Sequence, residues 1–234
     1  MINEKNTSLS PQGKFLRFFH LRWSAWIALI IVALIYEALP KSLYWGPRGL
    51  MIGIVIVLIL LAIILHKNAR IVRILGLSVN ILITLYMIMS VYRIVETVLK
   101  ENISPSHLLL SSMVLWITNI LVSALWYWNI DAGGPHRRSL TTGHGISAFL
   151  FPQTQICMYQ SSWTKQFIDW EPGFVDYLFL AFNTSTAFSP TDTPVITPWA
   201  KIMCMIQSMI SLTIVIMLAA RAINILNPGV MPGT

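Results

Sequence analysis

The chain has 234 residues, of which 56% are hydrophobic and 11% are charged. Soluble globular chains carry about 25% charged residues, so this composition excludes an ordinary soluble domain and favours an integral membrane protein. The net charge of +7 does not indicate a nucleic-acid partner, because no basic patch with interleaved aromatic residues lies outside the apolar runs.

The first half of the chain contains four apolar runs, each close to the ~20 residues that a helix needs to cross a bilayer. They cover residues 23–39, 49–66, 71–95 and 107–128. The fourth run ends in Trp126-Tyr127-Trp128, an aromatic group typical of the membrane interface. We therefore expect a cytoplasmic N-terminal segment over 1–22 and a four-helix membrane region over 23–128.

The next segment, 129–172, is more polar and contains a Gly-Gly-Pro-His-Arg-Arg turn. Its one apolar stretch is short and is interrupted by Pro152, so the segment is predicted to lie on the cytoplasmic surface. Arg137 and Arg138, together with Arg221 near the end of the chain, are candidates for binding acidic lipid headgroups, since each basic residue near the surface contributes about 1 kcal/mol. A plain orienting anchor is the simpler reading of all three.

The last part of the chain, 173–226, consists of an ambiguous segment and a final span. Residues 174–182 are apolar but 183–192 are not, so this segment is either a marginal fifth crossing or a half-helix that re-enters. Residues 199–226 form the final span, and 227–234 form a tail. A full crossing gives six spans with both chain ends in the cytoplasm, and we favour it over re-entry.

The loop charges support that topology. With six spans, the cytoplasmic side collects more basic residues than the outer side, as the positive-inside rule requires. The cytoplasmic set is Lys5, Lys14, Arg17, Arg22, Lys67, Arg70, Arg73, Arg137, Arg138, Lys165 and Arg221, and the outer set is Lys41, Arg48, Arg93, Lys100 and Lys201.

The segment 173–226 resembles the pore helix, filter loop and inner helix of potassium channels, in that order and without a gap. The filter motif T-V-G-Y-G-D is replaced by Ala187-Phe188-Ser189-Pro190-Thr191-Asp192. A potassium filter aims backbone carbonyls at the ion, and its backbone needs glycines that this chain lacks. The resemblance implies a pore built from several copies around one axis, with weak preference for monovalent cations and no potassium selectivity.

The stretch FVDYLFLAFNTSTAFSPTDT and the terminal ARAINIL also resemble a group of uncharacterised bacterial multi-span membrane proteins. This likeness implies a bacterial plasma (inner) membrane location and no particular activity.

Six residues are candidates for lining a permeation path: Thr184, Thr186, Ser189, Thr191, Asp192 and Asp176. Each has a structural alternative. Hydroxyls also join membrane helices to one another, a carboxylate after Ser-Pro-Thr also organises a turn, and Asp176 also suits the start of a helix. On the last span, Gln207, Ser208 and Ser211 are predicted to face the hydroxyl cluster.

The sequence thus predicts an all-α integral membrane helical bundle with six transmembrane helices, the fifth marginal or re-entrant. The preferred function is conduction of an ion or small solute by a homo-oligomer in the lipid bilayer. The alternative is a non-conducting interaction or assembly protein that presents 129–172 to a cytoplasmic partner or lipid surface. We find no nucleophile–base pair, phosphate loop or metal-ligand spacing, and therefore expect no enzyme activity, no cofactor and no metal.

Overall fold

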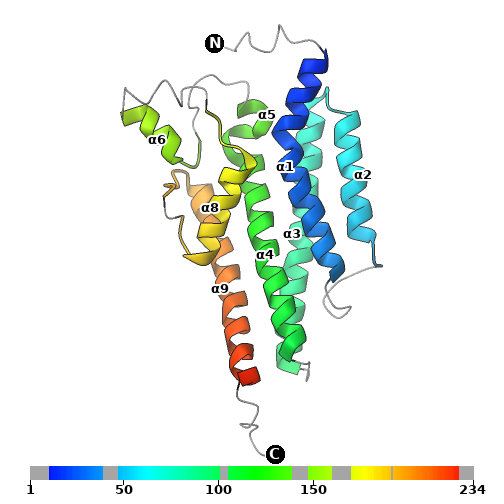
Figure 1. Ribbon diagram of the computed structural model, residues 1–234, viewed down its shortest axis with the longest axis vertical. Helices are drawn as coiled ribbons and strands as arrows, with labels where there is room; N and C mark the ends of the chain where they lie inside the picture. The colour runs from blue at the N-terminus through cyan, green and yellow to red at the C-terminus, as the bar shows by residue number, and fades with distance from the viewer. Residues whose placement is uncertain are drawn as a thin grey trace, which may run out of the picture.

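A computed structural model of the chain describes residues 11–38, 47–100, 105–138, 147–159, 170–190 and 192–226, some of them at helix ends by their backbone alone. The regular elements in these ranges are helices (Figure 1). The long ones are α1 (Pro11–Ala38), α2 (Leu50–Ile64), α3 (Ala69–Lys100), α4 (Pro105–Ile130) and α9 (Pro198–Leu226). The short ones are η2 (Asp131–Gly133), α5 (Pro135–Arg138), α6 (Pro152–Tyr159) and α8 (Phe174–Thr186).

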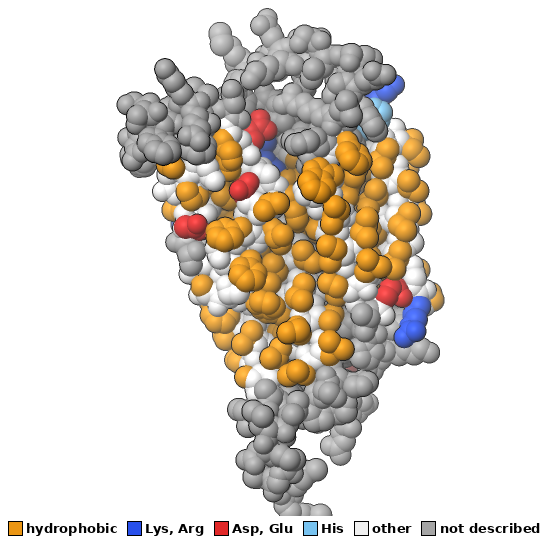
Figure 2. All heavy atoms as spheres, viewed as in Figure 1, with side chains coloured by type: hydrophobic (Ala, Val, Ile, Leu, Met, Phe, Trp, Pro, Cys, Tyr) orange, Lys and Arg blue, Asp and Glu red, His pale blue; other side chains and the backbone are white. Residues whose placement is uncertain are grey.

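The structure confirms an all-helical bundle with the surface expected in a membrane. Three described stretches are long and apolar enough to cross a bilayer, namely Ala69–Glu96, Leu108–Gly133 and Pro198–Ala219, and Leu50–Ile64 is a shorter apolar helix. Large hydrophobic side chains cover most of the face in Figure 2, and Met209 on α9 is 69% exposed. Because water would not tolerate so large an exposed apolar surface, the surface is compatible with lipid. Six spans are not confirmed.

Helix α4 lies at the centre and packs against α1, α3, α8 and α9. The beginning of α1 lies beside the end of α4, since the guanidinium carbon of Arg22 is 5.8 Å from the ring centre of Trp128. The beginning of α3 lies there too, because Gly76 faces the Asn129 amide. We call this the Asp131 end of the bundle, after the residue that follows α4.

Helix α8 does not cross the bundle. It has 13 residues, which is about 20 Å of helix against a hydrocarbon core of about 30 Å. The ring of Phe149 lies 6.1 Å from those of both Tyr177 on α8 and Trp199 on α9. Both helices therefore begin at the Asp131 end, and the chain must return to that end between them.

The return is visible in the backbone pairing. Val195 forms an antiparallel bridge with Phe149, and the Ile196 amide donates to the Ala148 carbonyl over 2.8 Å. The full crossing favoured by the loop charges is therefore not confirmed, since α8 runs along only part of the bundle and the chain returns from its end to the start of α9. Loop charges do not distinguish these cases, because a short half-helix and a marginal span have the same composition.

The first and last long helices run in the same direction, and the prediction of both chain ends on one side of the membrane stays a prediction. Helix α1 begins at the Asp131 end, whereas α9 starts there and runs to the opposite end (Figure 1).

Candidate functional site

A tight turn after α4 directs Asp131 into the bundle. Ala132, Gly133 and Gly134 all have positive φ, at 48°, 82° and 92°, which ends the helix and reverses the chain. A side chain on Gly134 would place its Cβ 2.9 Å from the Asn129 carbonyl oxygen, so glycine is required there. As a result Asp131 is fully buried.

The Asp131 carboxylate joins three segments that are distant in sequence. Its Oδ1 accepts the Ala148 amide at 2.7 Å, and its Oδ2 accepts the hydroxyls of Ser147 and Tyr177, each at 2.6 Å. Hydrogen bonds to a carboxylate are about twice as strong as neutral ones. Asp131 therefore ties the end of α4 and the segment that pairs with Val195 to the first turns of α8.

Arg138 closes the same turn from the other side. Its Nη1 donates to the carbonyls of Trp128 and Asp131, at 2.8 and 2.7 Å. The Trp128 carbonyl belongs to the last turn of α4, where carbonyls lack helical partners, and the Asp131 carbonyl also accepts the Gly134 amide. Its guanidinium carbon lies 5.1 Å from the ring centre of Tyr177. The sequence indicated a surface position for Arg138, but the structure buries it, while the neighbouring Arg137 is exposed.

The described part of the predicted surface segment is also partly buried. Ala148, Phe149 and Phe151 are at most 4% exposed, and Phe151 packs against the rings of Trp170 and Tyr177. Phe149 and Phe151 therefore pack against the first turns of α8, where both contact Tyr177.

A second polar cluster, centred on Gln207, joins α4, α8 and α9. The Gln207 Nε2 donates to the Ala181 carbonyl and to the Ser185 hydroxyl, both at 2.7 Å, and its Oε1 accepts the Tyr127 hydroxyl. The Asn119 amide donates to the Gln207 carbonyl at 3.1 Å. The predicted orientation of Gln207 towards the α8 hydroxyls is confirmed.

The other two residues predicted to face the hydroxyl cluster differ. The Ser208 hydroxyl donates to the Thr184 carbonyl at 3.4 Å, as expected. Ser211 instead accepts the Asn119 amide of α4 at 2.9 Å.

The two candidate threonines on α8 differ in exposure. Thr184 is fully buried, and its hydroxyl donates to the Leu180 carbonyl at 2.8 Å. Thr186 is exposed at the end of the helix, where its hydroxyl donates to the Phe182 carbonyl at 3.0 Å. Thr186 therefore lies on the outer surface of one copy of the chain, and Thr184 lies inside it.

Of the remaining candidates, Ser189 and Asp192 are exposed on the return segment. Asp176 is half-buried and accepts the Gly173 amide at 2.7 Å, which caps the start of α8. Thr191 and the side chain of Arg221 lie outside the described residues.

Sequence reasoning missed Asp131 as the centre of the arrangement. The available signal was a lone carboxylate directly after a 22-residue apolar run and before Gly-Gly. Its partners Ser147 and Tyr177 are 16 and 46 residues away, so the sequence alone does not pair them.

The two polar clusters indicate what holds α8 in place. Within the described ranges, no three His, Cys, Asp or Glu side chains are grouped to hold a metal ion. In comparisons with known proteins, no protein-family model, no curated protein and no solved structure matches this chain.

Proposed function

We propose that this chain assembles into a membrane pore that conducts small cations without potassium selectivity. The observation that supports the proposal best is the re-entrant half-helix α8 between α4 and α9, with its irregular return segment. Non-helical backbone is tolerated at membrane depth only where protein buries it or where it lines a water-filled cavity. Phe188 is 43% exposed and Ser189 is exposed in a single copy, so the segment needs further copies or water around it.

The electrostatics of α8 favour a cation. The C-terminal end of a helix carries about half a negative charge, and half-helix ends of this kind coordinate cations in membrane transporters. The exposed Thr186 hydroxyl lies at that end, and Ser189 and the Asp192 carboxylate follow it. Pro190 and the absence of filter glycines argue against a ladder of carbonyl sites.

A path between copies is favoured over a path through one copy. The polar side chains that face into the bundle, such as Thr184 and Gln207, are bonded to neighbouring helices and are at most 2% exposed. The side chains that remain for a solute, Thr186, Ser189 and Asp192, face outward. A homo-oligomer around one axis would bring them together.

The charge distribution suggests from which side α8 enters. Of the described basic side chains, most lie at the Asp131 end and two lie at the other end. The first set is Arg22, Lys67, Arg70, Arg73, Arg137, Arg138 and Lys201, and the second is Arg48 and Arg93. The positive-inside rule then assigns the Asp131 end to the cytoplasm, and α8 would re-enter from that face.

The proposal is tested with the purified full chain in liposomes that contain a cation-sensitive dye. We expect flux of sodium and potassium above that of empty liposomes. We expect Asp192→Asn to lower the preference for cations over anions several-fold, because the exposed carboxylate is lost. Glu171→Gln is the matched control, since it removes an exposed carboxylate that precedes α8 and lies outside the proposed path, and should leave the preference unchanged.

Absence of flux from the unaltered chain would overturn the proposed function. Flux that is identical in the Asp192→Asn variant would remove Asp192 from the path while leaving conduction in place.

A further inference from the structure

Two arginines are buried close together at the Asp131 end. Arg22 on α1 is 6% exposed and Arg138 on α5 is 7% exposed. Trp128 contacts both, because Arg22 lies 5.8 Å from its ring centre and Arg138 Nη1 donates to its carbonyl. Both guanidinium groups therefore lie beside Trp128.

The hydrogen bonds of Arg138 leave one side of its guanidinium without a partner. Nη1 bonds to two main-chain carbonyls, and neither bond neutralises the charge. The buried Nε–H has no partner among the described residues. The Asp131 carboxylate accepts from Ala148, Ser147 and Tyr177. A buried donor without an acceptor is costly, so the unsatisfied Nε edge of Arg138 favours an anionic acceptor.

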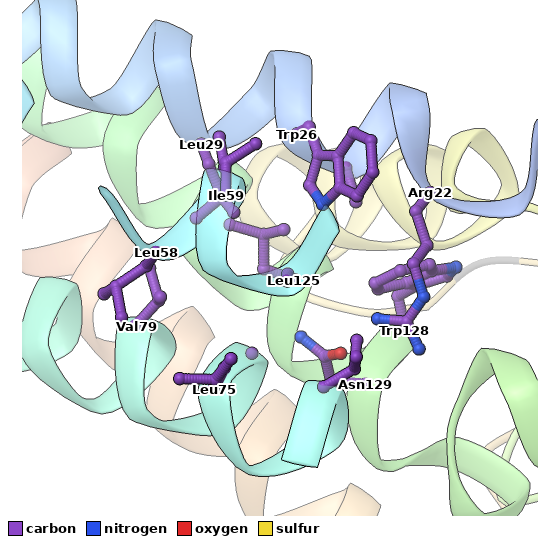
Figure 3. A pocket seen from close by; sticks show the side chains of 14 residues that line it. Arg22, Trp26, Leu29, Leu58, Ile59, Leu75, Val79, Leu125, Trp128 and Asn129 are labelled. Carbon is purple, nitrogen blue, oxygen red and sulfur yellow. The ribbon is translucent and has the colours of Figure 1, made fainter. Parts of the chain in front are cut away.

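A cavity lies beside Arg22, the other arginine that contacts Trp128. It measures about 30 Å³ and lies between α1, α2, α3 and α4. Arg22, Trp128 and Asn129 lie at one end of it, while Leu29, Leu58 and Ile59 line the rest (Figure 3). Arg22 therefore meets apolar walls on this side, which suits the junction between a headgroup and its acyl chains.

We propose that Arg22 and Arg138 form a site for a phosphate group, carried by an acidic membrane lipid or free in solution. Guanidinium binds phosphate through two parallel hydrogen bonds, and the Nε side of Arg138 offers such an edge. The basic side chains at this end suit the anionic lipids of the cytoplasmic leaflet. Arg137, the more exposed of the two adjacent arginines, is not part of the site. The site does not depend on conduction.

The test measures thermal unfolding of the purified full chain in neutral detergent. Phosphatidylglycerol, phosphatidylcholine or inorganic phosphate is added in separate arms, with sodium chloride matched for ionic strength. We expect phosphatidylglycerol, inorganic phosphate or both to raise Tm by several degrees relative to phosphatidylcholine and chloride, since a ligand that binds the folded state stabilises it. A shift with the lipid alone assigns a lipid headgroup, and a shift with inorganic phosphate assigns the free anion.

Three variants test which arginines produce the Tm shift. Arg138→Gln and Arg22→Gln should abolish the Tm shift, and Arg137→Gln, which removes the same charge from the exposed neighbour, should keep it. Arg22→Gln carries the test if Arg138→Gln does not fold, because Arg138 also bonds to the backbone. No shift in the unaltered chain, or an equal loss of the shift in Arg137→Gln, would overturn the site.

Discussion

At the scale of single residues, the buried Asp131 carboxylate determines how the chain is closed at one end of the bundle. Three donors from two other segments point at its two oxygens. An amide in its place would turn an NH2 group towards a donor, and one buried donor would lose its acceptor. Leaving a buried partner unsatisfied costs about 1–3 kcal/mol, and more when the partner was charged.

We therefore expect Asp131→Asn to lower the free energy of unfolding by about 3 kcal/mol, measured by thermal or denaturant unfolding in detergent. Tyr177→Phe is the graded control, because Oδ2 keeps its bond from Ser147 and the ring stays beneath Arg138. Its expected cost is about 1 kcal/mol. If Asp131→Asn lowers the free energy of unfolding no more than Tyr177→Phe does, Asp131 is not the main residue that holds these segments together.

At the scale of elements, Gln207 on α9 connects α8 to both of its neighbours, because it bonds to two groups on α8 and accepts from Tyr127 on α4. Hydrogen bonds between membrane helices average only about 0.6 kcal/mol, with a maximum of about 1.7. The cluster therefore fixes the relative positions of α4, α8 and α9 but contributes little to the free energy of unfolding.

Replacing Gln207 by leucine should lower the free energy of unfolding by about 1–2 kcal/mol, since three interhelical bonds are lost while the volume is kept. Met205→Leu on the same helix is the control, as Met205 is 64% exposed and should be neutral. Increased protease cleavage between α8 and α9 in Gln207→Leu, but not in Met205→Leu, would show that α8 has loosened. Equal stability and equal cleavage of the two variants would contradict the assigned role of Gln207.

The long elements could be predicted from sequence and the short ones could not. The runs 49–66, 71–95, 107–128 and 199–226 correspond to α2, α3, α4 and α9, because length and hydrophobicity suffice to specify a helix in lipid. The first run, 23–39, marks only the later part of α1, which begins at Pro11.

The turn after α4 and the course of α8 depend instead on contacts over long sequence distances. Phe149 pairs with Val195, and Asp131 bonds to Tyr177. No local sequence pattern predicts either contact. Of the candidate site, sequence reasoning named the residues at the end of α8, which remain a prediction, and it named Arg138 only as a surface anchor. It did not single out the Asp131 carboxylate, which bonds to Tyr177 near the start of α8.

At the scale of the whole molecule, re-entry of α8 makes the bundle asymmetric. Helices α1 to α4 alternate in direction, and α9 follows α4 as the next long helix (Figure 1). The short helix α8 lies between them in sequence and reaches only part of the way along the bundle. The segments immediately before α8 and before α9 consequently lie at one end, and residues 47–49, which precede α2, lie at the other.

This arrangement is tested by the sidedness of single cysteines. Cys157 and Cys204 are first replaced by serine, and cysteine is introduced separately at Glu171, Ile196 and Arg48, all exposed. In cells treated with an impermeant thiol reagent, positions 171 and 196 should share one accessibility, because the chain returns between them, and position 48 should show the opposite. Ile81, half-exposed in the middle of α3, is the lipid-facing control and should remain unlabelled. Labelling of 171 and 196 from opposite sides would mean that α8 crosses the bilayer, and the pore proposed around its end would lose its main support.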